Sequence, residues 1–455
     1  MNVVVIGTGY VGLNTAVALA YLNHSVIGID VDPSKVESLN KGIPIISEEG
    51  LPELLASLSG SPNLFFTTSY SSISSADVVF ITVGTPSNPD GSANLSYLYS
   101  AVDSIVAQLN SKHITKDLTI VIKSTVPIGV NSAIESRIKN DVFHSSLIHF
   151  CSNPEFLREG TALLDTFYPD RIVLGSNDEY SFSTLKTLYS NLITHSFIHP
   201  SSLPSLSEDP ISEVPVLCTD PLSSEMIKYA SNCFLALKIS YTNEISNLAR
   251  ALGANMRDIS KGMGLDHRIA PYFLNHGLGW GGSCFPKDSL ALLSIAKEYS
   301  LSLPITQASV DVNNSRIFTL ISILLSKLHT LYGKRITLFG ITFKPNTDDV
   351  RNSLPIDLAK ELVRRGAIVT LTDPVGIHNA KTIYSDEGFI FENDPVLASR
   401  NSDALIISTD WSIYRDLDYI FISSLMRNKI IFDARNLLYT KKDLLLENNI
   451  DYLTF

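Results

Sequence analysis

Short apolar runs alternate with helical patterns along the first part of the chain. Residues 2–6 are mostly β-branched, which predicts a strand buried on both faces of a parallel sheet. Residues 13–22 are rich in alanine and leucine and predict a helix. A second strand is predicted at residues 25–29, ending at Asp30. Further strands are predicted at residues 76–83, 118–123, 146–151 and 171–175. This alternation predicts a doubly wound parallel sheet.

The turn between the first strand and the first helix has the sequence Gly7-Thr8-Gly9-Tyr10-Val11-Gly12. Its glycines allow a tight turn and let a pyrophosphate approach the amino end of the helix, where the dipole favours anions. Asp30 is positioned to bond a ribose diol, and its carboxylate would repel a 2′-phosphate. The pattern therefore predicts an NAD site rather than a βαβ turn without a ligand.

Polar clusters follow three of the predicted strands, at residues 84–91, 124–127 and 153–160. In doubly wound sheets, ligands bind at the carboxyl ends of the strands. We therefore expect these three clusters to gather at one edge of the sheet.

One long helix is predicted at about residues 223–252, and Gly253 can end it. About thirty residues at ~1.5 Å each span ~45 Å, which is enough to connect two domains. Lys228 and Asn232 are four positions apart and share one face of this helix. From their spacing alone, these two side chains either lie on a solvated face of the helix or form part of a functional site.

A second α/β pattern begins near Arg335. Strands are predicted at residues 336–340, 368–371, 404–408 and 430–432, with a helix at residues 355–365. Asp373 follows the second of these strands, but the glycine motif is absent, so a nucleotide would need another phosphate turn. Three cationic side chains fall near the strand ends, those of Lys344, Arg351 and Arg435. They are either surface charges or contacts to a ligand.

These patterns predict two Rossmann-like doubly wound domains joined by a long connecting helix. The expected domains are residues 1–212, 213–325 and 326–455. Residues 200–215 are rich in proline and serine and are expected to form an exposed loop or a partly disordered insert.

The segment 279–288, GWGGSCFPKD, places Cys284 among glycines that let backbone approach a ligand, with Lys287 and Asp288 downstream. A thiolate is the reactive form of cysteine, and a nearby cation favours it. Alone, the segment is typical of a glycine-rich turn with a buried cysteine. Beside an NAD site, it indicates oxidation of an aldehyde to an acid through a thiohemiacetal and a thioester.

Such chemistry requires an oxyanion stabiliser and a base that activates water. Lys228 and Asn232 can stabilise the oxyanion. Asp288, Glu155 and Thr125 can handle protons and water.

The composition of the chain limits the classes of molecule that it is expected to bind. The net charge is −11, from 35 basic and 46 acidic residues, which disfavours nonspecific binding of nucleic acid or anionic membranes. The first apolar run is too short for a signal peptide or a membrane span. The four cysteines lack metal-ligand spacing and the histidines lack a ligand motif, so we expect a reducing cytoplasm and no structural metal.

The chain resembles the UDP-glucose/GDP-mannose dehydrogenase family over almost its whole length. The matching motifs are GTGYVG at 7–12, GTPSNPDGSANLSYL at 84–98, KSTVPIG at 123–129, NPEFLREGTA at 153–162, PDRIVLG at 169–175, EMIKYASNCFLALKISYTNEI at 225–245, GWGGSCFPKD at 279–288 and FKPNTDDVRNS at 343–353. The resemblance implies an NAD domain, a central helical dimerisation domain and a C-terminal domain that holds UDP. It also implies two successive oxidations at C6 of UDP-glucose, giving UDP-glucuronate.

The resemblance assigns Cys284 as the nucleophile, Lys228 and Asn232 to the oxyanion, and Asp288, Thr125 and Glu155 to protons and water. The implied cofactor contacts are Gly7, Gly9, Tyr10, Val11, Gly12, Asp30, Lys35, Thr85, Thr125, Glu159 and Arg351. The implied substrate contacts are Glu155, Phe156, Leu157, Lys228, Asn232, Arg268, Phe273, Gly281, Phe285, Lys344 and Arg435. Arg268 resembles an arginine that reaches the substrate across a dimer interface, so a homodimer or higher homo-oligomer is implied.

Two alternatives stay open. The substrate can be another nucleotide sugar, such as GDP-mannose or a UDP-hexosamine, although Trp280 and the segment 170–172 favour UDP-glucose. A non-catalytic NAD-binding scaffold would need no nucleophile, and the joint presence of Cys284 with its expected helpers argues against it. The insert at 200–215 is longer than the resemblance leads us to expect.

Overall fold

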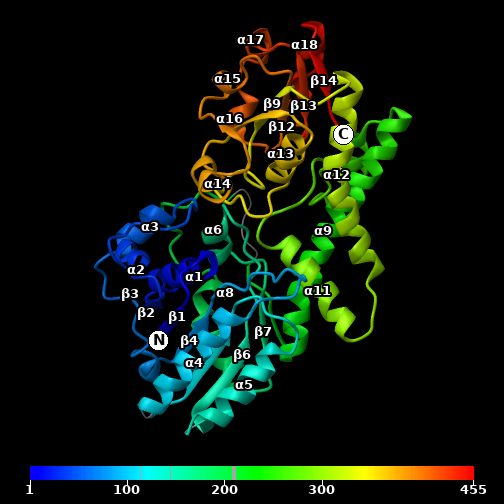
Figure 1. Cartoon of the computed structure of the whole chain (residues 1–455). Coiled ribbons are helices and arrows are strands. Elements are labelled where there is room, and N and C mark those ends of the chain that lie inside the picture. Colours follow the sequence, from blue (N-terminus) through cyan, green and yellow to red (C-terminus); the bar gives the residue numbers. More distant parts are fainter. Residues whose placement is uncertain (113, 144, 207–211) are drawn as a thin grey trace. The chain divides into compact units, whose positions relative to one another are not determined.

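Strands and helices alternate from the amino terminus, as the apolar pattern predicts (Figure 1). The computed structural model describes residues 1–112, 114–143, 145–206 and 212–455. The chain divides into two compact units, Met1–Ala230 and Ser231–Phe455. The finer three-domain division at 212 and 325 stays a prediction.

In the described part of the first unit, eight strands pair in the order β3-β2-β1-β4-β5-β6-β7-β8. The strands are β1 Asn2–Ile6, β2 Ser25–Ile29, β3 Leu64–Thr67, β4 Val78–Ile81, β5 Leu118–Ile122, β6 Ile148–Ser152, β7 Ile172–Gly175 and β8 Val216–Thr219. The helices before the boundary are α1 Tyr10–Tyr21, α2 Pro33–Asn40, α3 Leu51–Leu58, α4 Ser96–Ser111, α5 Val130–Asp141, α6 Ala162–Phe167, α7 Glu179–Leu188 and α8 Ser190–Ile193. This topology is that of a doubly wound sheet with two added strands.

The sheet is not parallel throughout, because β7 runs antiparallel to β6, with Ser152 opposite Gly175. The prediction of a fully parallel sheet was wrong at this pair. The connection between the two strands contains α6, which has six residues. The whole connection, residues 153–171, is long enough for a parallel crossover, so the direction of β7 is set by tertiary packing rather than by chain length.

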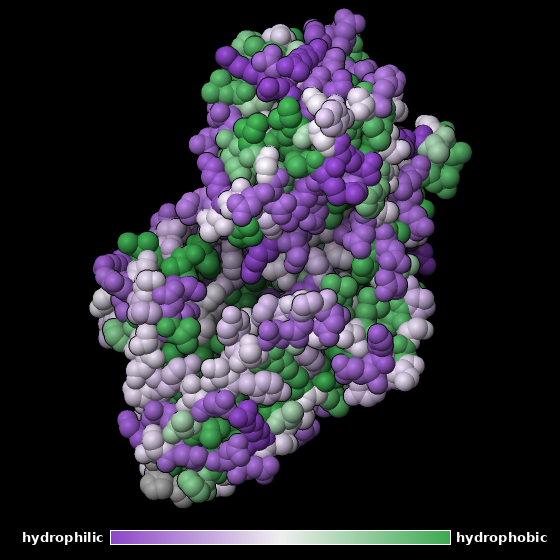
Figure 2. All heavy atoms as spheres, viewed as in Figure 1, coloured by the Kyte–Doolittle hydropathy of each residue, from purple (hydrophilic) through white to green (hydrophobic). Residues whose placement is uncertain are grey.

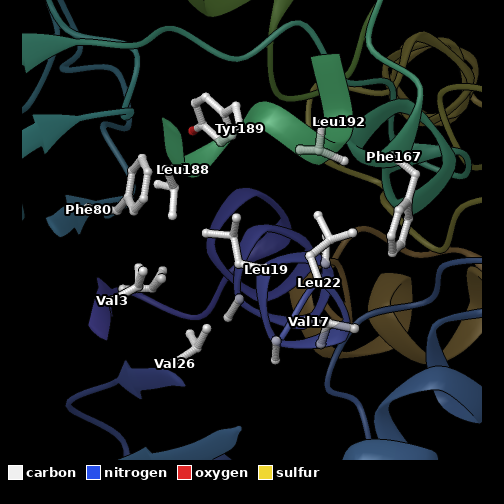
Figure 3. Packing of buried hydrophobic residues seen from close by; sticks show 14 of the residues in the cluster. Val3, Val17, Leu19, Leu22, Val26, Phe80, Phe167, Leu188, Tyr189 and Leu192 are labelled. Carbon is white, nitrogen blue, oxygen red and sulfur yellow. The ribbon is translucent and has the colours of Figure 1, made fainter. Parts of the chain in front are cut away.

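A buried helix forms the centre of one core of the first unit. All residues of α1 from Gly12 to Ala20 are buried, and most are small, which lets the helix pack closely against the sheet. Figure 3 shows Leu19 of this helix and Leu22, which follows its last residue, among Leu188, Leu192 and Phe167. A second apolar cluster covers the other face of the sheet.

The proline- and serine-rich insert is anchored in this core at both flanks. Leu203 and Val214 are buried, and the Val214 amide donates to the Ile193 carbonyl at 2.9 Å. The expected exposed loop was therefore wrong at these two positions, because their apolar side chains gain free energy by burial. Residues 207–211 lie outside the described residues.

Helix α9, Pro221–Leu252, continues from the first unit into the second and confirms the predicted long helix. Its first turns lie at the carboxyl edge of the first sheet. The Glu225 carboxylate accepts from the backbone amides of Gly129 at 2.6 Å and Asn131 at 2.8 Å, at the amino end of α5. Ser224 Oγ donates to Ser152 Oγ at 3.0 Å. These bonds fix the helix that carries Lys228.

In the second unit, the described strands form a six-stranded parallel sheet in the order β11-β10-β9-β12-β13-β14. The strands are β9 Arg335–Phe339, β10 Ile368–Thr372, β11 Ile390–Phe391, β12 Ala404–Ile407, β13 Ile430–Asp433 and β14 Asp451–Leu453. The helices after α9 are α10 Met256–Gly264, α11 Phe285–Glu298, α12 Pro304–Leu328, α13 Leu354–Arg364, α14 Ile377–Ile383, α15 Pro395–Ala398, α16 Ser412–Arg415, α17 Tyr419–Leu425 and α18 Lys442–Glu447. The predicted fold class is confirmed.

Helices α9 and α12 lie side by side in this unit (Figure 1). Ser240 Oγ of α9 donates to the Ser309 carbonyl at 2.7 Å, and the fully buried Arg316 of α12 donates to Asn247 Oδ1 at 2.7 Å. Within the described ranges, we find no helix with both the length and the apolar character that crossing a membrane requires. On the face shown in Figure 2, hydrophilic and apolar residues are interspersed.

Candidate active site

The glycine turn joins β1 to α1 and has the geometry of a dinucleotide site. Gly7 has φ 93°, a left-handed conformation that favours glycine. A Cβ on Gly12 would lie 1.8 Å from the Gly7 carbonyl oxygen, so this position excludes a side chain. A Cβ on Gly9 would meet no described atom within 4 Å. The open space at Gly9, at the amino end of α1, fits the pyrophosphate of NAD.

Asp30 follows β2 and is nearly buried. Its Oδ2 accepts from the Thr8 amide at 3.1 Å and from Thr8 Oγ1 at 2.7 Å, and its Oδ1 accepts from the Asp32 amide at 3.1 Å. These bonds hold the carboxylate beside the glycine turn, where the ribose of a dinucleotide would lie.

The corresponding aspartate of the second sheet, Asp373, is more heavily bonded. Its Oδ2 accepts from the amides of Ile341 at 2.8 Å and Thr342 at 3.2 Å and from Trp411 Nε1 at 3.2 Å. Its Oδ1 accepts from the amide of Gly376 at 2.8 Å. Asp373 therefore stabilises the loops of its own unit, as a structural carboxylate.

The three polar loops of the first unit meet at its carboxyl edge, which confirms that prediction. Thr85 Oγ1 donates to the Thr125 carbonyl at 2.7 Å, which joins the loops after β4 and β5. Lys123 Nζ donates to Asn153 Oδ1 at 3.0 Å, which joins the loops after β5 and β6. Glu159, on the last of these loops, is buried.

A buried ion pair lies at this edge. Lys228 Nζ donates to Glu155 Oε1 at 2.8 Å, and only 3% of Lys228 and 7% of Glu155 are exposed. Glu155 Oε2 accepts from the Leu157 amide at 2.8 Å. The Phe156 ring centroid lies 5.5 Å from Lys228 Nζ and 3.7 Å from the Arg171 guanidinium carbon. Buried pairs are weak evidence for stability, but ionisable groups buried at a ligand edge are candidates for function.

Cys284 stands at the amino end of α11 in the second unit, as the N-cap residue. A helix amino terminus favours the thiolate. Asp288, one turn further along and 1% exposed, accepts from Asn232 Nδ2 and from Lys287 Nζ, both at 2.6 Å. The structure thus joins the predicted residues Asn232 and Asp288 next to the helix turn that carries Cys284.

Two other cysteines have a different environment. Burial raises the pKa of the Cys151 thiol, and burial raises the pKa of the Cys233 thiol to about 11. Both are therefore protonated at neutral pH and unsuited to nucleophilic chemistry.

The glycines around Cys284 pack against the protein itself. A Cβ on Gly279 would lie 2.4 Å from Asn313 Oδ1, and one on Gly281 would lie 2.3 Å from the Asn352 carbonyl oxygen. The described contacts of these two glycines are thus with the chain rather than with a ligand. Arg435 donates to the Gly279 carbonyl at 3.2 Å, which ties the loop to the second sheet.

The remaining predicted residues occupy separate places. Arg268 is exposed and forms an ion pair with Asp266 at 2.6 Å. Arg351 forms one with Asp349 at 2.7 Å, and the Phe273 and Phe285 rings lie 6.2 Å apart between centroids. Lys344 Nζ lies 5.6 Å from the centroid of the Phe343 ring. Lys35 lies on α2.

Two site residues were missed from the sequence. Lys123 comes directly after a buried strand, at the ligand edge, and that position was a signal. Glu48 accepts from the backbone amides of Gly160 at 2.6 Å and Ala162 at 2.8 Å and so fixes the loop that carries Glu159. Glu48 and Gly160 are more than a hundred residues apart in the sequence, so no local pattern indicates that they are in contact.

The fold and the glycine turn define an NAD-binding dehydrogenase. The NAD binding domain, central domain and UDP binding domain of the UDP-glucose/GDP-mannose dehydrogenase family match residues 1–193, 222–315 and 337–440. The chain therefore belongs to this family, and NAD is its cofactor.

The chain is similar to known proteins of the family. It is 40% identical over 437 residues to UDP-glucose 6-dehydrogenase YwqF of Bacillus subtilis, covering 96% of this chain and 93% of the relative. It is 40% identical over 440 residues to UDP-glucose 6-dehydrogenase of Rickettsia conorii, covering 96% of each. A solved UDP-glucose dehydrogenase from Pyrobaculum islandicum matches with a TM-score of 0.85 and 38% identity over 95% of this chain and 94% of that one.

Two alanine substitutions in the glycine turn should separate cofactor binding from folding. Gly9→Ala adds a methyl group where no described atom is in contact, so the melting temperature should stay unchanged. The methyl group would occupy space needed by the pyrophosphate, and the Kd for NAD should rise roughly tenfold or more. Calorimetric titration with NAD measures this change, and an unaltered Kd would contradict the assignment of Gly9.

Gly12→Ala is the matched comparison. Its methyl group would collide with the Gly7 carbonyl, so this variant should lose stability, by about 1–3 kcal/mol or more. Thermal unfolding without NAD should show the loss for Gly12→Ala alone.

Proposed function

We propose that the protein oxidises C6 of UDP-glucose twice, to UDP-glucuronate, with Cys284 as the nucleophile of the second oxidation. The position of Cys284 at the amino end of α11, one turn before the Asn232–Asp288 contact, carries this proposal. The activities for which the similar relatives are named support the choice of UDP-glucose.

NAD, when bound, would supply the acceptor for the hydride that C6 loses in each oxidation. The first oxidation also removes the C6 hydroxyl proton and leaves an aldehyde. The Cys284 thiolate then adds to the aldehyde carbon and forms a thiohemiacetal. Loss of the second hydride converts it to a thioester, and water cleaves the thioester to the carboxylate and the thiol.

Charge on the C6 oxygen has to be stabilised in these steps. Lys228 and Asn232 are the proposed donors, and they lie one turn apart on the continuous helix α9. Their bonds to Glu155 and Asp288 hold both side chains in place, and an ammonium and an amide are both hydrogen-bond donors. Glu155, Asp288 and Thr125 are the proposed groups for protons and water.

The other roles follow from the family. Gly7, Gly9, Gly12 and Asp30 are proposed to hold the pyrophosphate and ribose of NAD. Lys344 and Arg435 fall within the stretch that matches the UDP binding domain and are proposed to contact UDP-glucose. Burial lowers the pKa of Arg435, yet a guanidinium stays charged at neutral pH and suits an anionic ligand.

We also propose a homodimer formed through α9. Phe234, Tyr241 and Leu248 recur at intervals of seven residues, lie on one helix face and are exposed. A second copy of the chain would bury this apolar stripe. The exposure of Arg268 leaves it accessible to a partner subunit. The four cysteines, all in the described ranges, form no disulfide, which supports a reducing compartment such as the cytoplasm.

The ratio of NADH formed to sugar consumed tests the reaction. With UDP-glucose the expected yield is two NADH per sugar, measured by absorbance alongside chromatography of the nucleotide sugars. GDP-mannose and a UDP-hexosamine serve as competing substrates. If either gave a higher kcat/KM than UDP-glucose, that sugar would be assigned as the substrate instead. If none of the three sugars yielded NADH, a non-catalytic scaffold would be favoured.

Cys284→Ser should reduce the overall production of UDP-glucuronate by at least about 10³-fold, because a serine hydroxyl is a far weaker nucleophile than a thiolate. Cys218→Ser is the control, since Cys218 lies on β8, and it should keep the full yield. Wild-type rates in the Cys284→Ser protein would refute the role of the thiol.

Phe234→Glu together with Leu248→Glu should convert the protein to a monomer, because two charges would enter the proposed apolar interface. Light scattering coupled to gel filtration should show half the wild-type mass. Leu446→Glu, at an exposed apolar position on α18, is the control that should leave the mass unchanged. A wild-type mass in the double variant would exclude this interface.

A further inference from the structure

Lys123 occupies a fixed position at the carboxyl edge of the first sheet. It follows β5 directly, and its Nζ donates to Asn153 Oδ1 at 3.0 Å. The same oxygen accepts from the Tyr189 hydroxyl at 2.7 Å, while Asn153 Nδ2 donates to the Val173 carbonyl at 2.9 Å. Asn153 is itself 2% exposed. The acceptor of Lys123 is thus locked by two other bonds, two residues before Glu155.

The charged groups that act on Lys123 are those of the buried pair. Burial lowers the pKa of Lys123 to about 8, Glu155 opposes that shift by attraction, and the ammonium of Lys228 adds to it by repulsion. Two lysines therefore share the field of a single buried carboxylate, although only Lys228 is hydrogen-bonded to it in the described structure.

This arrangement matters when Lys228 acts on substrate. In the proposed function, on which this inference rests, Lys228 donates to an oxyanion that forms at C6. As it does so, its attraction to Glu155 weakens, and a buried carboxylate without a compensating cation is costly. We propose that Lys123 is a positioning residue that supplies the second positive charge for Glu155 and so lets Lys228 serve the substrate.

The inference predicts an alkaline limb in the kcat profile. Lys123 is protonated below about pH 8 and loses its charge above it, so kcat should fall as the pH rises through that value. Lys123→Met should lower kcat at pH 7 roughly tenfold, with little change in KM, and should abolish this limb. Lys123→Arg should restore most of kcat at pH 7 and keep it to higher pH.

Lys41→Met is the matched control, since Lys41 pairs with Glu37 on the surface. It should leave both kcat and the profile unchanged. A purely structural role for Lys123 would lower kcat equally at every pH, and that result would overturn the inference.

A direct titration separates this inference from the proposed function. In protein labelled with [6-¹³C]lysine, the resonance missing from Lys123→Met identifies Lys123, and its midpoint should lie near pH 8. Glu155→Gln removes the attraction and should shift the midpoint down, whereas Lys228→Met removes the repulsion and should shift it up. A midpoint that neither substitution moves would refute the coupling. Coupling in a protein that does not oxidise any nucleotide sugar would count against the proposed function alone.

Discussion

Burying an ammonium group and a carboxylate is tolerable only when the two are bonded, and the edge of the first sheet is arranged around one such pair. Lys228 comes from α9, and Glu155 comes from the loop after β6. The helix is held there by Glu225 and Ser224, and the loop by bonds from Leu157 and Asn153. The placement of the pair therefore depends on several elements at once.

The same helix carries Asn232, one turn beyond Lys228, to a second buried carboxylate, Asp288. Lys228 and Asn232 are thus four positions apart on α9, and each is bonded to an acid from another element of its own unit. The overall charge of the chain is −11, so cations at the site are supplied locally by such contacts rather than by a general positive field.

The sequence predicted regular, fully buried elements well. The strands at residues 2–6 and 25–29 and the long helix were confirmed, because uninterrupted apolar runs and helical periodicity are strong local signals. Strands β3, β8, β11 and β14 were missed, since they are short and carry exposed or partly exposed positions. The reversal of β7 is set by tertiary packing, which no local pattern reveals.

For the site, the sequence indicated which residues take part but not which side chains they are bonded to. Spacing placed Lys228 and Asn232 on one face, yet their carboxylates are 73 and 56 positions away. Which acid orients which donor is set by tertiary packing. The glycines near Cys284 were explained by approach to a ligand, whereas the described contacts show that packing against Asn313 and Asn352 already requires them.

The saturated carboxylate of Asp373 limits how far the two sheets are interchangeable. Its Oδ2 accepts from the Ile341 and Thr342 amides, much as Asp30 Oδ2 accepts from the Thr8 amide of the glycine turn at residues 7–12. Trp411 Nε1 also donates to Asp373, so a ribose at this carboxylate would compete with the indole. A second dinucleotide site in this unit would thus require a change at Trp411 as well as a glycine turn after β9.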